Sequence, residues 1–146
     1  MPVLVGGWLV AGRFHPAIPM LRHSVILQGA PDAVMRRIRS TFESGNVLVR
    51  QPDRLVARFG GKAGRFAFKT VELITFDERE VTFEHLGGTF LGCRERFVVT
   101  PRGERQTELS HEGWFKLRGG LAGWLLGVTV VRRLFVRHVE HTMASF

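Results

Sequence analysis

The fold is decided by the C-terminal stretch Gly119–Phe146, GGLAGWLLGVTVVRRLFVRHVEHTMASF. The region between about Val47 and Leu117 alternates instead with a period of two, which is typical of antiparallel strands. A long helix that follows such strands can bury its apolar stripe on the concave face of their sheet, and this arrangement favours an enclosed pocket. The apolar residues of the stretch recur at steps of three and four, the period of one helix face: Leu121, Trp124, Leu125, Val128, Val131, Phe135, Val139 and Met143.

The rest of the chain, which has 146 residues, supplies one more helix and the strands of a single domain. A first strand is predicted at Leu21–Gln28, and a helix begins at Ala30-Pro31-Asp32, where proline and an acidic residue suit a first turn. Ser44-Gly45-Asn46 ends this helix. The sequence therefore predicts one α+β domain over residues 21–146. Its later strands are predicted at 47–50, 55–59, 65–76, 81–86, 90–100 and 106–117.

Residues 1–20 form an apolar N-terminal arm in which Arg13 is the only charged residue. The arm lacks the positive start of a secretory signal, and glycine and proline interrupt it too often for a membrane span. We expect it to pack on the domain or on a second subunit, which would give a homodimer. A weak contact with an anionic membrane surface is the alternative.

The composition narrows the classes of function. A net charge of +8, from 21 Lys+Arg and 13 Asp+Glu, favours anionic surfaces. The arginines are scattered, however, and no DNA- or RNA-binding signature occurs, so nucleic acid is not an expected partner. The single cysteine, Cys93, excludes an internal disulfide, fits a reducing cytoplasmic compartment and is expected to be a small buried hydrophobe. We expect no cofactor, and no metal site, because no carboxylate accompanies His138 and His141 in a ligand pattern.

Several short motifs together resemble the START-like helix-grip superfamily, and most closely its polyketide cyclase/dehydrase and lipid-transport branch. They are the helix start at 30–34, Phe90-Leu91-Gly92, Arg94-Glu95-Arg96-Phe97 and Thr107-Glu108-Leu109, followed by the terminal helix. The resemblance covers residues 21–146. It implies a curved antiparallel sheet of about seven strands wrapped on a long C-terminal helix, with a hydrophobic molecule bound between them. A minority of such proteins are cyclases or aromatases.

The chain departs from that superfamily in one respect. Many members have a second short helix after the first, whereas here only about four residues separate Phe42 from the next strand. The mouth of a pocket is therefore expected to be more open, or closed by the N-terminal arm.

Strand alternation predicts which residues face inward between 81 and 99. A three-residue turn at Gly87-Gly88-Thr89 places Phe83 opposite Cys93 and Val81 opposite Glu95. These four residues then share the inner face of the sheet. His85 shares it too, at roughly 13 Å from the row of Glu95 at ~3.3 Å per residue.

The same alternation continues through the turn at Pro101–Arg105 and pairs Glu95 with His111 and Leu91 with Phe115. A carboxylate and a histidine on an apolar face are costly to bury unless they bond to each other or to a ligand. We therefore single out Glu95 and His111 as the candidate catalytic pair, in which the carboxylate orients the histidine as a general base. A purely structural hydrogen bond is the alternative.

Other inward positions are candidates for contact with a ligand. The helix contributes through its uncharged half, Gly119–Val131, in which Gly119, Gly123 and Gly127 repeat every four residues. Because glycine costs a helix up to ~1 kcal/mol, this stripe indicates close approach of a strand, a ligand or another helix. The half from Arg132 onward is expected to face water. The predicted ligand-binding residues are Phe83, His85, Leu91, Cys93, Phe97, Leu109, Phe115, Trp124 and Val128.

Three functions follow in order of preference. The first is a binding or carrier protein for a hydrophobic small molecule such as a lipid, quinone or polyketide-like compound. The second is a cyclase or dehydrase that uses Glu95 and His111 to move protons. The third is a peripheral membrane or partner-binding protein. No phosphate-binding loop, nucleophile elbow or paired acidic metal motif occurs, so no conventional kinase, hydrolase or dehydrogenase is predicted.

Overall fold

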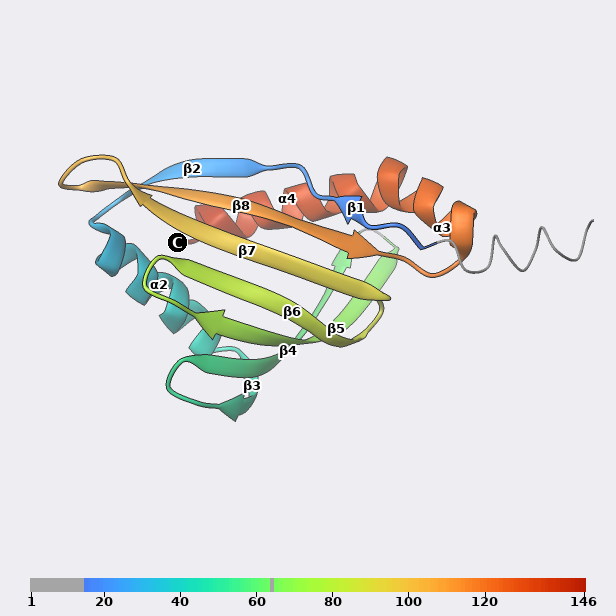
Figure 1. Cartoon of the computed structure of the whole chain (residues 1–146), viewed down its shortest axis with the longest axis horizontal. Coiled ribbons are helices and arrows are strands. Elements are labelled where there is room, and N and C mark those ends of the chain that lie inside the picture. The colour runs from blue at the N-terminus through green and yellow to red at the C-terminus, as the bar shows by residue number, and fades with distance from the viewer. Residues whose placement is uncertain (1–14, 64) are drawn as a thin grey trace, which may run out of the picture.

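A computed structural model describes residues 15–63 and 65–146 (Figure 1). One antiparallel sheet curves around a long C-terminal helix, and a shorter helix covers one end of the sheet. The elements in chain order are β1 (Ile18–Pro19), β2 (His23–Gln28), α2 (Pro31–Glu43), β3 (Asn46–Arg50), β4 (Arg54–Ala63), β5 (Phe66–Phe76), β6 (Glu80–Gly88), β7 (Gly92–Pro101), β8 (Gln106–Lys116), α3 (Gly120–Leu126), the π-helix η1 (Gly127–Val131) and α4 (Arg132–Ala144).

The sheet confirms the predicted α+β helix-grip class, with eight strands where about seven were expected. Its order is β1-β8-β7-β6-β5-β4-β3, and β2 also pairs with β8. The strands β1 and β2 thus share one edge, where β1 pairs with Phe115 and Trp114 and β2 with the stretch 106–111. Part of the sequence assigned to the N-terminal arm therefore belongs to the sheet, and Ile18 is fully buried. Residues 1–14 of the arm lie outside the described residues.

The helix α2 begins and ends where the sequence predicts. Ala30 is its N-cap, and Pro31 and Asp32 occupy its first turn, where a missing N–H and a negative charge are both tolerated. Its buried residues, Val34 and Ile38, pack into the larger of two hydrophobic clusters. α2 lies across the end of the inner face, and its buried residues share this cluster with Val139 and Met143 of α4.

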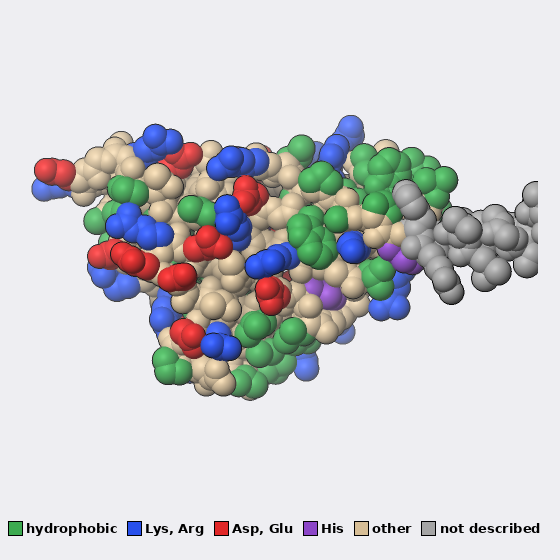
Figure 2. Space-filling model, viewed as in Figure 1, with side chains coloured by type: hydrophobic (Ala, Val, Ile, Leu, Met, Phe, Trp, Pro, Cys, Tyr) green, Lys and Arg blue, Asp and Glu red, His purple; other side chains and the backbone are tan. Residues whose placement is uncertain are grey.

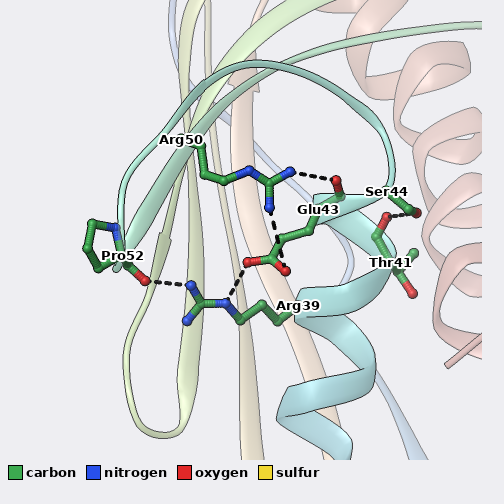
Figure 3. Close-up of polar contacts among 6 residues, drawn as sticks. All are labelled: Arg39, Thr41, Glu43, Ser44, Arg50 and Pro52. Carbon is green, nitrogen blue, oxygen red and sulfur yellow. Dashed lines mark hydrogen bonds and ion pairs between the residues drawn. The ribbon is translucent and has the colours of Figure 1, made fainter.

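The last turn of α2 is tied to the β3–β4 hairpin by a group of polar contacts (Figure 3). Nε of Arg39 donates to Oε1 of Glu43 at 2.8 Å, and the guanidinium of Arg39 also donates to the carbonyl of Pro52. Arg50, from β3, donates to the backbone carbonyl of Glu43 at 3.1 Å. These contacts fix the turn that carries Phe42, whose ring packs edge-on against Phe83 of the sheet at 4.9 Å.

The C-terminal helix is continuous but not uniform, because the π-helix η1 separates α3 from α4. Two of its glycines make the close approach that the sequence predicts, Gly127 to the sheet and Gly123 to the connection between β8 and α3. A Cβ on Gly127 would lie 2.2 Å from Cδ1 of Ile18, and a Cβ on Gly123 would lie 1.9 Å from the carbonyl oxygen of Arg118. Gly127 therefore serves contact with the β1–β8 edge of the sheet, and Gly123 serves the tight connection that leads into α3.

The predicted strand register is wrong by two residues at both turns. Phe83 pairs with Glu95 instead of Cys93, and Phe97 pairs with His111. The cause is the length of the turns. The pairing of β6 with β7 ends at Glu84, and a backbone hydrogen bond between residues 102 and 106 closes the β7–β8 turn. A shift of two residues returns every strand side chain to the same face, so the inward and outward assignments within the strands survive it.

The outer face of the sheet carries alternating charges (Figure 2). Arg96 lies between Glu80 and Glu112, at 3.5 and 2.5 Å, and Arg94 lies 3.5 Å from Glu84. Such exposed pairs contribute little to stability individually, at about 0–1 kcal/mol each. Oppositely charged side chains on neighbouring strands do, however, favour exposure of the outer face to water, with the apolar face of the sheet inside.

The solvent side of α3 and η1 has a different character. Leu121, Leu125, Leu126 and Val130 are about half exposed, and apolar side chains gather at that end of the molecule in Figure 2. Within the described residues, no helix combines the length and the apolar character that crossing a membrane requires. The predicted membrane contact and the predicted homodimer both stay predictions.

We predict that Gly123→Ala destabilises the protein although alanine is the better helix former. Propensity alone would add up to about 1 kcal/mol of stability. The new methyl group, however, would overlap the backbone carbonyl of Arg118, which cannot rotate away. Overpacking of this kind typically costs about 1–3 kcal/mol. Urea denaturation should show a lower free energy of unfolding; unchanged or higher stability would contradict the close approach. The control is Leu121→Ala on the exposed side of α3, which should change stability by less.

Candidate functional site

A row of polar side chains crosses the otherwise apolar inner face of the sheet. It runs from Thr70 and Glu72 on β5, past His85 on β6 and Glu95 on β7, to His111 on β8. Thr70, Glu72 and His111 are buried. Buried polar groups are costly unless they are bonded, so such a row is a candidate site.

The contact between Glu95 and His111 anchors this row. Nε2 of His111 lies 2.7 Å from Oε2 of Glu95, although the two residues are diagonal neighbours and not directly paired. The residue directly opposite Glu95 is Gly113, on which a Cβ would lie 3.2 Å from Cγ of Glu95. Because Gly113 has no side chain, the carboxylate can turn toward His111.

The surroundings of His111 fix its protonation pattern. Its side chain is 1% exposed, it packs on the Phe97 ring, and its buried Nδ1 atom has no hydrogen-bond partner among the described residues. A buried N–H without a partner costs more free energy than a buried lone pair without one. The neutral tautomer that fits therefore carries its proton on Nε2, and this N–H donates a hydrogen bond to Glu95. His111 therefore fixes the orientation of the Glu95 carboxylate through this hydrogen bond.

Glu72 is the second buried carboxyl group, and the inward-facing analysis of the sequence missed it. Its Oε1 accepts a hydrogen bond from the Thr70 hydroxyl at 3.0 Å. Burial raises the pKa of Glu72, and the nearby negative charge of Glu95 raises it further. The hydrogen bond from Thr70 lowers the pKa by less, so that the pKa rises from 4.5 to about 7. Near neutral pH this group can therefore donate or accept a proton.

Cys93 also belongs to the neighbourhood of Glu95, with its Sγ atom 3.7 Å from Oε1. The thiol is buried, and burial next to Glu95 and Glu72 raises its pKa far above the ordinary value. Since the thiolate is the reactive form, Cys93 is an unreactive packing residue at this position.

A small cavity lies where this row meets α4. Its volume is ≈ 80 Å³, well below the roughly 300–1,000 Å³ of pockets that enclose drug-sized ligands. Seven phenylalanines dominate its wall, with two carboxylates between them. The lining residues are Phe42, Phe59, Phe68, Thr70, Glu72, Phe83, Phe90, Glu95, Phe97, Phe135, His138, Val139 and Thr142.

The predicted ligand-binding residues are only partly at this cavity. Phe83 and Phe97 line it, as does the predicted catalytic residue Glu95. Leu91 is 41% exposed in the β6–β7 turn, so its inward assignment is wrong. The remaining predicted residues lie on the inner face or against it but not on the cavity wall: His85, Cys93, Leu109, Phe115, Trp124, Val128 and His111.

The half of the C-terminal helix that meets the cavity is also opposite to the prediction. Phe135, His138, Val139 and Thr142 of α4 line the cavity, whereas the glycine-bearing half packs against Ile18 and Phe115. At Gly127 the helix packs directly on Ile18 and Phe115, which leaves no gap between the helix and the sheet there.

His85 is nearer to the row than the sequence analysis placed it. Because Phe83 pairs with Glu95, His85 lies only two residues along β6 from that row, or roughly 7 Å at ~3.3 Å per residue. Its Nδ1 atom is buried and has no hydrogen-bond partner in the part of the chain that the structure describes. Within residues 15–63 and 65–146, however, no three His, Cys, Asp or Glu side chains are arranged to hold a metal ion.

Sequence comparisons give no match, either to a protein-family model or to a curated protein. Solved structures do match. A protein from Thermus thermophilus is 20% identical over 86% of this chain and 90% of its own, with a TM-score of 0.71. The chain has the START-like helix-grip fold. An aromatase/cyclase from a Streptomyces species is 13% identical over 88% of each chain, with a TM-score of 0.68. A START superfamily protein from Mycobacterium smegmatis is 18% identical over 84% and 92%, with a TM-score of 0.58.

We predict that Glu72 makes this START-like domain less stable as the pH rises from 4.5 to about 7. A carboxyl group whose pKa is higher in the folded protein binds its proton more tightly there. Its stabilising contribution is therefore complete below the unfolded pKa and is lost as the pH rises through the folded pKa of about 7. The loss is about 3 kcal/mol.

The variant Glu72→Gln keeps an acceptor for Thr70 but removes the charge, so it should lose this part of the pH dependence. Urea denaturation at several pH values measures it. Glu84→Gln, on the exposed face, is the matched control and should retain the slope of the parent protein. A Glu72→Gln slope equal to that of the parent would show that Glu72 is not the titrating group.

Proposed function

We propose that this protein binds a hydrophobic small molecule between its sheet and α4. The observation that carries the proposal is the cavity lined by phenylalanines from α2, four strands, α4 and the β6–β7 turn. Such a wall, with few polar groups to orient a ligand, is the usual composition of small-molecule sites. The aromatase/cyclase and START protein among the structural matches support the fold of such a site, while the ligand is inferred from the cavity itself.

The size of the cavity defines how a ligand would fit. A volume of ≈ 80 Å³ takes a small group and not a whole lipid. The rest of a larger ligand would therefore lie outside the cavity. Burial of about 200 Å² of apolar ligand surface would contribute about 5 kcal/mol, which corresponds at best to a Kd of about 0.2 mM. Tighter binding needs the phenylalanine rings to move and enclose more of the ligand.

We predict that Thr142→Trp abolishes binding of an apolar fluorescent probe such as N-phenyl-1-naphthylamine. Thr142 lines the cavity from α4, and the larger ring would fill it, weakening binding at least tenfold. Thr129→Trp is a matched control, because both threonines donate to the backbone carbonyl four residues earlier but Thr129 faces solvent. Fluorescence titration measures both variants, and native mass spectrometry of the purified protein tests for a retained ligand. Equal probe binding by the two variants would place the ligand elsewhere.

A cyclase or dehydrase activity at the same site is the second candidate. The observation that favours it is a carboxylate, Glu95, that faces the cavity while His111 orients it, opposite a second carboxyl group, Glu72, with a pKa of about 7. One ionised and one protonated carboxyl group are suited to removing a proton from a carbon next to a ketone and returning one to oxygen. In this arrangement Glu95 contacts the substrate and His111 positions Glu95, which reverses the roles expected from the sequence.

For this second candidate, we predict that Glu95→Gln lowers kcat on a poly-ketone substrate by at least ~100-fold, the usual contribution of a general base. Probe binding should be nearly unchanged, because the amide has the shape of the carboxyl group. The measurement is cyclised product by mass spectrometry, beside a probe titration of the same sample. A variant that binds the probe and retains full turnover would remove Glu95 from the reaction.

A further inference from the structure

The ionisable groups on the cavity wall differ in sign from the rest of the protein. The chain carries 21 Lys+Arg against 13 Asp+Glu. The described residues that line the cavity nevertheless include Glu72 and Glu95 and no lysine or arginine. Their carboxyl groups are close enough for the charge of Glu95 to act on Glu72. Thr70 and Cys93 are weak donors to this pair, so only His111, among the described residues, partners it strongly.

The remaining wall is suited to a positive charge as well. Seven phenylalanine rings surround the two carboxyl groups. The face of an aromatic ring is electron-rich and attracts cations, and most strongly where water is excluded. An engineered apolar cavity of about 150 Å³ accommodates benzene, so ≈ 80 Å³ suits a compact head group.

We propose that the cavity selects a ligand with a cationic ammonium head group on an apolar body. This inference rests on the proposed binding function and names the ligand class of that site. The ammonium group lies between Glu72 and Glu95, and the apolar part of the ligand lies against the phenylalanine rings of the cavity wall. A ligand that ends in a carboxylate, such as a fatty acid, is disfavoured because it would bring a third negative charge to the pair.

Binding of a cation is then linked to proton release. Glu72 is about half protonated near pH 7, and a cation favours its ionised form. The other titratable groups near it are Glu95 from β7, His85 opposite it on β6 and His138 from α4. Protonation of either histidine also opposes a cation, so only a comparison with Glu72→Gln isolates the contribution of Glu72.

The experiment compares three ligands of similar shape and different charge by displacement of N-phenyl-1-naphthylamine. They are benzyltrimethylammonium, its neutral isostere neopentylbenzene, and phenylacetate. We expect the ammonium compound to displace the probe at a concentration at least tenfold below that of the isostere, and phenylacetate to be the weakest. From about pH 6 to about pH 8 the affinity for the ammonium compound should rise roughly tenfold, as Glu72 ionises.

Glu72→Gln should reduce the preference for the cation and flatten its pH dependence, whereas Glu84→Gln on the exposed face should change neither. If the probe and neopentylbenzene bind but the ammonium compound binds no better, the cationic ligand class is overturned and the hydrophobic site stands. If neither the probe nor any of the three compounds binds, the proposed function itself is overturned.

Discussion

The close approach of the C-terminal helix to the β1–β8 edge is the constraint on which the site depends. Gly127 lets η1 come close to Ile18 of β1, at a distance that any side chain would prevent, and Gly123 does the same for α3 and the carbonyl of Arg118 in the connection after β8. The helix is thereby fixed at one end. Farther along the helix, Phe135 and Val139 of α4 line the cavity, so the room for a ligand lies on that side. The site therefore lies beside α4, beyond the glycine-bearing part of the helix.

The polar row on the inner face shows how a mostly apolar core can hold ionisable groups. Each group has a specific reason to be tolerated: Glu95 bonds to His111, and Glu72 receives the Thr70 hydroxyl and is partly protonated at neutral pH. Gly113 contributes by its lack of a side chain, which leaves space for the Glu95–His111 bond. Replacement of one partner alone would leave the other buried and unpaired, which is usually more costly than the bond is worth.

The strand and helix periods in the sequence predicted the fold and the inner face of β6 to β8. They could not predict register, because register depends on turn geometry, and both turns near Gly88 and Gly103 differ in length from those assumed. The inner position of Glu72 could have been found by extending the same alternation to β5, since Thr70, Glu72 and Ile74 alternate there. The position of the cavity could not be predicted from the sequence, because it depends on how α4 packs against the sheet.

The pairing of β1 and β2 with β8 also has a consequence for how the chain folds. Val25 pairs with Leu109 and Ile18 with Phe115, so segments from opposite ends of the sequence meet at one edge of the sheet. Contacts between residues so distant in sequence form late and slow the search for the native state. During synthesis on the ribosome, β1 and β2 remain unpaired until β8 has been synthesised and has emerged. Their exposed edges are then open to association with other chains, and this protein is expected to depend on chaperones more than a helical protein of its size.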